Sequence, residues 1–316
     1  MRRYMLRRMA YIPLIVVVVS FLTFFVLRLP WSVDPATVYI NQNTTPEQEA
    51  AIRADLGIDK PAWEQFVVWM GDVLTGDMGR TFRGDQPVMD EITRRLPVTL
   101  EILILSVVFS TIIGVPLGIL CAVKQNTWLD YACRFMVVFG QSVPAFFLLI
   151  LLIVLPSIWW NYAPPIGGHV SIFEDPVENL RLYVPPTLLL SAAGAAGMIR
   201  ITRSSMLEVF RQDYMRTARA KGLDGRAVVF SHGLRNSLIP IVTIIGAEIT
   251  ILFFGSLILE QIFSINGVGQ FLFISATVAD FPVVQFLVFY TAIIVMLLNL
   301  LIDLSYALID PRVKYS

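Results

Sequence analysis

The sequence is poor in the residues from which catalytic and metal centres are usually built. Its 316 residues include only two histidines and two cysteines. Neither a His-Glu-x-x-His nor a Gly-x-Ser-x-Gly motif occurs, and neither His169 nor His232 has a Ser or Cys arrangement nearby that suggests nucleophilic catalysis. These absences argue against an enzyme. We therefore predict no catalytic residue and no metal site, and we interpret His232 as structural.

A nucleotide-binding loop is also missing. The pattern Gly-x-x-x-x-Gly-Lys-Ser/Thr does not occur, and the segment from Gly222 to Arg226 has neither its spacing nor its Lys-Ser/Thr pair. If the protein performs transport, the energy must therefore come from another subunit or from an ion gradient.

Charge is scarce as well, and the charged residues lie between long apolar runs. Charged residues make up 15% of the chain and hydrophobic residues 56%, more than the usual apolar share of a soluble domain. The runs approach the roughly 20 residues that cross a bilayer as a helix, and the alternation of a barrel strand is absent. We predict an all-α integral membrane protein with about six transmembrane helices, near residues 9–27, 98–123, 131–155, 184–201, 239–259 and 283–308.

The first apolar run has a second possible interpretation, because the arginines that precede it resemble the start of a signal peptide. However, the run continues to Leu27, which is longer than a typical signal-peptide core, and Arg28-Leu-Pro-Trp follows instead of a small-residue cleavage site. We interpret it as a retained first span.

Basic residues gather in the loops on one side of this topology. By the positive-inside rule that side is the cytoplasm, which places both termini there and the protein in the cytoplasmic membrane. The opposite loops lean acidic, although the formal net charge is zero. No basic patch interleaved with aromatics occurs, so we predict no nucleic-acid partner. Besides the N-terminal arginines, the basic residues on this side include Lys124, Arg134, Arg200, Arg203, Arg211, Arg216, Arg219, Lys221, Arg226, Arg235, Arg312 and Lys314.

The two cysteines, Cys121 and Cys133, fall at the cytoplasmic ends of neighbouring spans. Disulfides are rare on that side of the membrane, and the spacing is not that of a metal site. We predict that they form no disulfide and fill small apolar spaces.

The predicted outer segment, residues 30–97, is too long for a simple turn. Thr45, Pro46 and Gln48 have the form of a capping box with proline at the first helical position, and Gly57 is placed to end that helix. A second amphipathic stretch begins at Pro61, and its aromatic residues suit either a small core or an anchor at the membrane surface. We expect a small helical lid on the outer surface of the membrane.

A polar island from Arg200 to Asn236 separates two apolar runs and is longer than a turn requires. Asp213 is a good N-cap, Gly222 stands where a left-handed helix end is wanted, and Asp224 can cap a second helix. Small residues and cations alternate on the first helix. This pattern suits a docking surface for an acidic groove, and it also suits a solvated loop that only obeys the positive-inside rule.

A few polar residues fall inside the predicted spans. Glu248 lies deep in the fifth, where a carboxylate is disfavoured by several kcal/mol unless it faces water or a partner. We predict that it lines a translocation path and engages a cationic group; a hydrogen-bonded glutamate in a helix contact is the alternative. In the third span, Gln141, Ser142 and Pro144 form a polar kink site that supports the bend or lines the path.

Small residues mark where helices are expected to approach closely. Gly114, Gly118 and the cluster at 192–197 suit packing seams, either within the chain or with a second copy of a similar chain.

The island also carries a resemblance to a known family. Arg216 to Leu223, followed by His232 to Pro240, resembles the cytoplasmic signature loop of permease subunits of bacterial binding-protein-dependent ABC importers, in the branch for dipeptides, oligopeptides or nickel. Other strings similar to that branch follow in the same order over nearly the whole chain, at 76–81, 94–101, 260–264, 267–269, 280–285, 299–303 and 310–312. The sequence departs from the family at Arg216, where many importers have Glu, at Gly233, where alanine is usual, and at Asn266, where proline is common.

This resemblance implies a fold like that of type I importer permeases and a role as the permease subunit of an ATP-driven peptide importer. It divides the chain into a cytoplasmic arm with the first transmembrane helix (1–29), an outer helical segment (30–97), a five-helix core (98–310) containing the coupling loop (200–237), and a cytoplasmic tail (311–316). The implied partners are a second, similar permease in a heterodimer, two cytoplasmic ATPase subunits that hold ATP and Mg²⁺, an external substrate-binding protein, and membrane lipid. The residues implied to couple to the ATPase are Arg216, Thr217, Ala218, Arg219, Ala220, Lys221, Gly222, Leu223 and Asp224.

Two alternatives remain at this stage. The same type of complex could carry nickel chelates or oligosaccharides, because substrate choice in such systems rests largely with the binding protein. An ion-coupled secondary transporter would need ionisable groups within the bilayer, for which Glu101, Glu248 and Asp303 are candidates.

Overall fold

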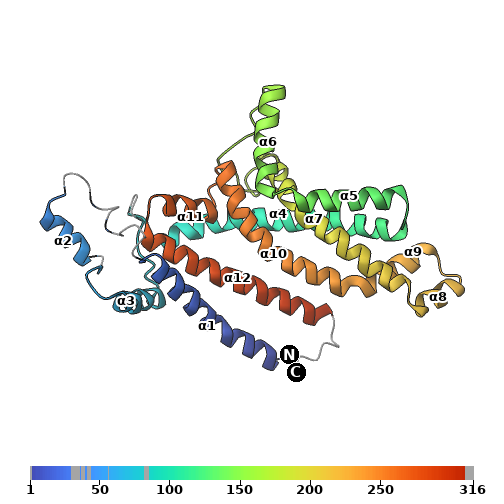
Figure 1. Ribbon diagram of the computed structural model, residues 1–316, viewed down its shortest axis with the longest axis horizontal. Coiled ribbons are helices and arrows are strands. Elements are labelled where there is room, and N and C mark those ends of the chain that lie inside the picture. The colour runs from blue at the N-terminus through green and yellow to red at the C-terminus, as the bar shows by residue number, and fades with distance from the viewer. Residues whose placement is uncertain are drawn as a thin grey trace. The chain divides into compact units, whose positions relative to one another are not determined.

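The computed structural model describes residues 2–29, 36, 40, 44–55, 57–81 and 85–309. The predicted tail with Arg312 and Lys314, and the side chain of Asp303, lie outside the described residues, as does part of the predicted outer segment. The regular structure of the described residues is helical, with one isolated antiparallel bridge between Arg80 and Pro87. The helices are α1 (Arg2–Val26), α2 (Pro46–Asp55), α3 (Ala62–Thr75), α4 (Val88–Val123), α5 (Trp128–Ser142), α6 (Ala145–Trp160), α7 (Pro176–Phe210), α8 (Asp213–Ala220), α9 (Gly225–Ala227), the π-helix η2 (Val228–Leu234), α10 (Arg235–Phe263), α11 (Val268–Thr277) and α12 (Phe281–Ile309) (Figure 1).

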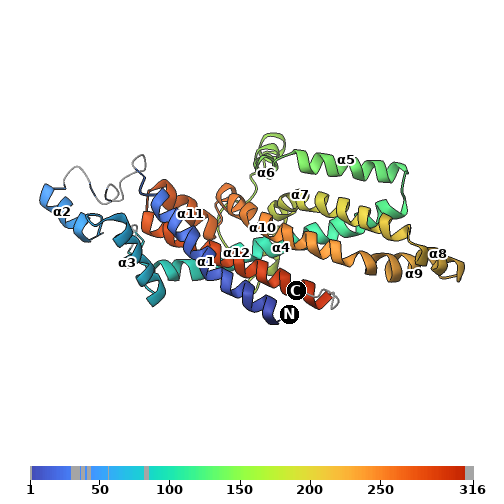
Figure 2. The same ribbon diagram turned by 60° about the horizontal axis from the view of Figure 1, so that its bottom comes forward.

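The chain forms two compact units, and each is described by itself. Unit 1 joins residues up to Pro97 with Gly267–Leu297. Figure 2 gives a second view of α1 beside α12, and Val16 shares a buried apolar cluster with Phe286 and Leu287. Burial of these side chains holds residues from the two ends of the chain together.

Aromatic side chains fasten α3 into unit 1. Phe66 lies edge-on to Phe24, with ring centroids 5.4 Å apart, and Trp69 meets Phe289 in the same manner at 6.1 Å. The guanidinium of Arg28 lies 3.6 Å from the centre of the Phe24 ring and donates to Gln65 Oε1 at 2.8 Å. Burial lowers the pKa of Arg28 to about 10, so it stays charged at neutral pH. The α3 aromatics thus form a small core here, and the expected lid on the membrane surface stays a prediction.

The start of α2 has the predicted capping box. The backbone N–H of Thr45 donates to Gln48 Oε1 at 2.9 Å, and that of Gln48 donates to Thr45 Oγ1 at 3.3 Å. Gly57 follows the helix with φ +64°, as a left-handed stop requires.

Unit 2 is built around α7, which packs against α4, α5, α6 and α10. A Cβ on Gly114 would lie 2.4 Å from Met198 Cβ, and one on Gly118 would lie 2.6 Å from Thr202 Cβ. No side chain fits at such distances, so α4 approaches α7 only because both positions are glycine. The predicted seams are therefore internal to this chain.

Within the described part of the chain, four helices are long and apolar enough to cross a membrane, namely α4, α7, α10 with the residues before it from Gly225, and α12 up to Ile302. The third predicted span is a pair of helices, α5 and α6, bent by 93° at the break between Ser142 and Ala145 (Figure 1). Counted as one crossing, the pair makes a fifth. The apolar part of α1 that is described, Ala10–Val26, is shorter than the other spans.

The bend between α5 and α6 is at the predicted kink site. Val143 is extended (φ −92°, ψ 121°), and Pro144 precedes the first residue of α6. Proline has no backbone N–H to donate, and it also disfavours helical geometry in the residue before it, so the helix ends there.

The expectation for the two cysteines is wrong in one part. Cys121 and Cys133 are paired as a disulfide, with their Cα atoms 6.7 Å apart, and both are buried beside Val137, Ala196 and Ile199. The turn at 124–127 sends α5 back along α4, which brings the two positions together. Their apolar setting was predicted, whereas their pairing depends on a close approach that spacing does not reveal.

Candidate functional site

The polar island folds into the two-helix element that the caps predict. We call residues 211–227 the coupling loop, which is the part of the predicted loop at 200–237 that lies between α7 and η2. Its role in coupling stays a prediction. Its first helix, α8, begins one residue earlier than expected. Gln212 is the N-cap and makes no side-chain capping bond, so the prediction that Asp213 caps the helix is wrong. Asp213 is the first residue of α8 and still lies in its first turn, where a negative charge is favourable.

Glycine and aspartate shape the turn between α8 and α9 as predicted. Gly222 has φ +74°, and a Cβ built there would meet nothing within 4 Å. Glycine is therefore wanted for its left-handed backbone and not for space. Asp224 then accepts a hydrogen bond from the backbone N–H of Arg226 at 3.1 Å and caps α9.

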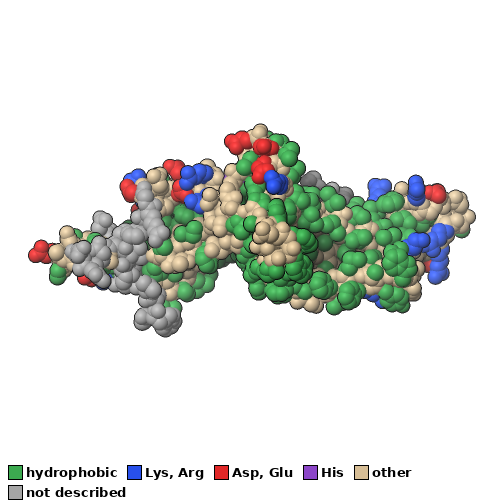
Figure 3. Space-filling view, turned by 90° about the horizontal axis from the view of Figure 1, so that it is seen from above, with side chains coloured by type: hydrophobic (Ala, Val, Ile, Leu, Met, Phe, Trp, Pro, Cys, Tyr) green, Lys and Arg blue, Asp and Glu red, His purple; other side chains and the backbone are tan. Residues whose placement is uncertain are grey.

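One face of α8 is anchored to the rest of unit 2, and the other is free. Met215 is fully buried and Ala218 is 7% exposed. Arg216 is exposed, with Asp213 at 3.7 Å as its ion-pair partner. Lys and Arg side chains gather at the end of unit 2 that holds α8 and α9 (Figure 3). The buried apolar side of α8 thus holds the helix against unit 2, and its outer face is basic.

The element after α9 is a π-helix, which the sequence reasoning missed. A Cβ on Gly233, within η2, would come within 2.7 Å of the Phe210 ring and 3.1 Å of Met206 Cε. The glycine lets η2 pack against the end of α7, which couples the loop to that helix. The only signal in the sequence was Gly233 itself, a glycine within a segment that was expected to be helical.

Glu248 lies at a contact of three helices. It is 4% exposed, and Ser110 Oγ of α4 donates to its Oε2 at 2.6 Å. Its other oxygen, Oε1, has no hydrogen-bond partner among the described residues and faces Gly197 of α7, which with Gly194 leaves the room for the carboxylate. Glu248 is therefore shielded from water in this conformation.

Of the other predicted pathway residues, the structure brings Gln141 close to Glu248 and leaves two apart. A Cβ on Gly197 would lie 3.3 Å from Glu248 Oε1 and 3.8 Å from Gln141 Nε2, so both side chains approach the same glycine. Gln141 Oε1 accepts from Arg200 at 3.3 Å. Ser142 is exposed and donates to the carbonyl of Val138 at 2.7 Å. Pro144 is exposed at the bend. The four residues thus divide into a polar pair around Gly197 and a hinge.

Two protein-family models together match most of the chain. Residues 114–315 match the family model described as "Binding-protein-dependent transport system inner membrane component", and residues 1–103 match its N-terminal companion model. The chain belongs to this family. It is 35% identical to the dipeptide transport system permease protein DppB of Escherichia coli (strain K12), 34% identical to the protein of the same name in Alkalihalophilus pseudofirmus, and 34% identical to a putative peptide transport system permease protein of Brucella abortus (strain 2308), in each case over the whole of both chains.

A solved structure supports the fold of the permease. A chain of the MetNI methionine ABC transporter in inward-facing conformations matches with a TM-score of 0.54 and 21% identity, over 71% of this chain and 98% of that chain. At this identity the likeness concerns the fold alone. The permease is thus an all-α membrane protein of the type I importer class.

The permease also holds polar pairs that the sequence reasoning did not find. Asp130 of α5 is fully buried, and both its oxygens accept from Arg203 of α7, at 2.6 and 2.9 Å. At the other end of α4, Thr99 Oγ1 donates to the buried Glu260 at 2.6 Å, and Asn179 donates to Glu101 at 2.6 Å. No local pattern signals these pairs, because their members are far apart in the sequence.

Proposed function

We propose that this permease forms the path by which peptides cross the cytoplasmic membrane, in a complex with a second permease, two ATPase subunits and an external binding protein. The names of the full-length relatives, which describe dipeptide and peptide transport, support the substrate class. The family description, which names dependence on a binding protein, supports the external partner. The coupling loop carries the proposal, because its geometry suits a firm attachment to a moving partner.

In this proposal, the coupling loop passes movement between the ATPase and the helices α7 and α10. Met215 and Ala218 anchor α8 from below, and η2 continues through the first residues of α10 without a break. A push on the outer face of α8 therefore reaches α10 and α7 as a rigid movement. Of the two small residues predicted to face the ATPase, Ala218 is buried and Ala220 is exposed, so Ala220 is the one that allows an acidic ATPase groove to come close. Arg216, Arg219 and Lys221 supply cations for that groove. ATP and Mg²⁺ are bound by the ATPase subunits and not by this chain.

The translocation path is proposed to run beside Glu248 and Gln141. In another conformation, separation of α7 from α10 would expose Glu248 Oε1, the oxygen that has no hydrogen-bond partner here. A carboxylate exposed at this depth would attract the cationic amino terminus of a peptide. Ser142 and Pro144 would supply the bend that shapes the path between α5 and α6.

The test is to uncouple the loop while leaving the fold intact. Proline cannot adopt the φ of +74° found at Gly222, so Gly222→Pro should abolish peptide uptake in proteoliposomes while ATP hydrolysis continues or loses its dependence on the binding protein. Ala220→Trp should act in the same way by blocking close approach. Gly222→Asn is the matched control, because asparagine tolerates left-handed backbone. Normal coupling in both test variants, each verified as inserted, would overturn the assigned role of the loop.

A ligand measurement distinguishes peptides from the other substrates. Mass spectrometry of the small molecule that co-purifies with the partner binding protein should detect short peptides. A nickel chelate or an oligosaccharide would retain the importer assignment and replace its substrate.

A further inference from the structure

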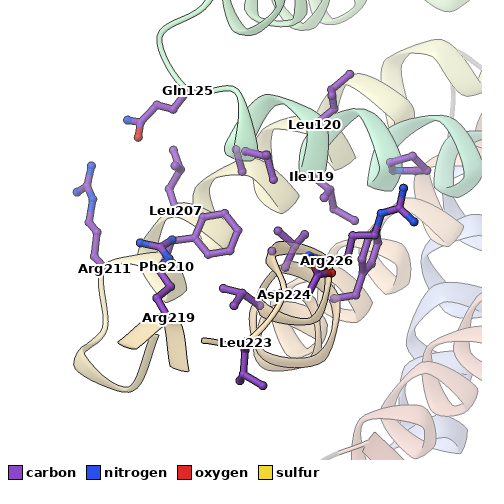
Figure 4. Close-up of a pocket in the computed structure, with 17 residues that line it drawn as sticks. Ile119, Leu120, Gln125, Leu207, Phe210, Arg211, Arg219, Leu223, Asp224 and Arg226 are labelled. Carbon is purple, nitrogen blue, oxygen red and sulfur yellow. Dashed lines mark hydrogen bonds between the residues drawn. The ribbon is translucent and has the colours of Figure 1, made fainter. Parts of the chain in front are cut away.

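A hollow beside the coupling loop shares Arg219, Leu223 and Asp224 with the residues implied to couple to the ATPase, and the rest of its lining has no role in the proposed function. It has a volume of about 1060 Å³ and is open on one side. Figure 4 shows its walls, which come from the last turns of α4, the last turn of α7, and the chain from Arg219 to Phe230. All of these belong to unit 2. The hollow therefore lies where two membrane-crossing helices end and the polar island begins.

The interior of the hollow is apolar. Ile119 of α4 packs with Leu207 and Phe210 of α7 and with Val229 of η2 to form an apolar part of the lining. Leu120, the residue after Ile119, also lines the hollow (Figure 4). Leu120 is 38% exposed and Phe230, on the rim, is 54% exposed. Apolar surface of this kind, left open next to span ends, is suited to a hydrocarbon chain and gains free energy when it is covered.

The rim of the hollow is basic. Arg211, Arg219 and Arg226 line it, and their guanidinium groups have no hydrogen-bond or ion-pair partner among the described residues. Asp224 is the acidic residue of the described lining, and one of its carboxylate oxygens is engaged by the backbone N–H of Arg226. The net charge at the rim is thus positive, and guanidinium groups bind phosphate through paired N–H donors.

We propose that this hollow binds one anionic phospholipid of the cytoplasmic leaflet, with an acyl chain against Ile119, Leu207 and Phe210 and the phosphate at the basic rim. The apolar interior and basic rim match the two parts of such a lipid, and the level of the site matches the position of its headgroup. An acidic groove of an ATPase fits less well, because the hollow is concave whereas docking requires the convex face of α8. The bound lipid would brace α4 and α7 against the coupling loop.

Native mass spectrometry of the full-length permease, purified with the subunits that accompany it, measures retained lipid directly. The probe is phosphatidylglycerol, supplied in nanodiscs at three parts to seven of phosphatidylcholine. The double variant Arg211→Gln/Arg226→Gln should weaken retention of one phosphatidylglycerol by about tenfold or more, because each arginine near the surface contributes separately. Leu120→Trp, which fills the rim, should reduce it without changing any charge.

Lys124→Gln is the matched control, because this substitution removes one cation just after α4. Lys124 does not line the hollow. The control variant should keep retention within about twofold of wild type. Equal retention in wild type and both test preparations would overturn the proposal. So would loss of the ATPase subunits from the double variant with phosphatidylglycerol still bound, which would make the hollow part of the ATPase dock. Lipid is read on the permease itself, so a failed role for the coupling loop leaves this measurement intact.

Discussion

Single residues in this permease act mainly by what they allow a neighbouring helix to do. Gly114 and Gly118 admit α7 to α4, Gly233 admits η2 to α7, and Gly194 and Gly197 make room for the carboxylate of Glu248. Gly222 differs, because its surroundings are empty and only its backbone angle matters. The same residue type thus serves close approach in the membrane and a tight turn outside it.

Glu248 gives the prediction at this scale. Glu248→Gln keeps a partner for Ser110 but removes the charge, so uptake of peptides with a free amino terminus should fall about tenfold, the value of a charge-assisted hydrogen bond. Uptake of the same peptides after N-acetylation should change little. Both are measured as initial rates in proteoliposomes that contain the whole complex.

The control for Glu248 is Ser110→Ala, which removes the hydroxyl donor and leaves the charge. It should affect the two peptide classes equally, because it acts only through packing. If Glu248→Gln leaves both classes at the wild-type rate, the residue is a helix contact and has no role in the path.

At the scale of elements, a buried ion pair holds one end of a helix whose other end is at a proline bend. α5 ends at the 93° bend, so its other end must be fastened elsewhere. Asp130 does this, because it receives Arg203 of α7, Arg134 of its own helix and the backbone N–H of Asn126. The far end of α5 is therefore attached to α7 by contacts that do not involve the bend.

Removal of this attachment should be destabilising. Asp130→Ala leaves Arg203 with 19% side-chain exposure and no counter-charge, a change that costs about 3 kcal/mol when the pair is buried. The melting temperature of the detergent-solubilised permease should fall clearly, as measured by a thermal-shift assay. Arg134→Gln is the control, because Arg134 is 46% exposed and exposed pairs contribute about 1 kcal/mol or less. Equal melting temperatures for Asp130→Ala and Arg134→Gln would contradict the bracing role.

At the scale of the whole molecule, we propose that the permease depends on partners for energy. Its sequence has no nucleotide-binding loop. Among the described residues, two buried carboxylates each accept a hydrogen bond from a hydroxyl group, Glu248 Oε2 from Ser110 and Glu260 Oε1 from Thr99. Such hydroxyl pairs stabilise a helix bundle and do not by themselves make an ion pathway.

Reconstitution tests this dependence. Vesicles with the complete complex should accumulate peptide only when ATP is supplied on the cytoplasmic side and the binding protein on the outer side. Vesicles that contain this subunit alone, with an imposed proton or sodium gradient and no ATP, should show no uptake above that of empty vesicles. Uptake driven by a gradient in the second case would establish the secondary-transporter alternative.

Local chemistry explains which elements were predictable. The capping box at Thr45 and Gln48, the turn at Gly222, the cap at Asp224 and the break at Pro144 each depend on a residue and its immediate neighbours, which the sequence displays directly. The apolar runs likewise determine the spanning helices, since a bilayer admits no other way to satisfy the backbone. Asp213 shows the limit of this reasoning, because helix ends shift by a residue when neighbouring packing favours it.

By itself, the sequence determined the class of the protein, its long apolar helices and the turn and second cap of its coupling loop. Only the tertiary structure decided that Cys121 meets Cys133, that Asp130 holds Arg203, that Glu248 is enclosed against α7, and that an apolar hollow opens beside the loop. The reason is physical. Helices and turns are set by interactions within a few residues, whereas these contacts depend on how closely glycines let two helices approach. No single segment of the sequence specifies that distance.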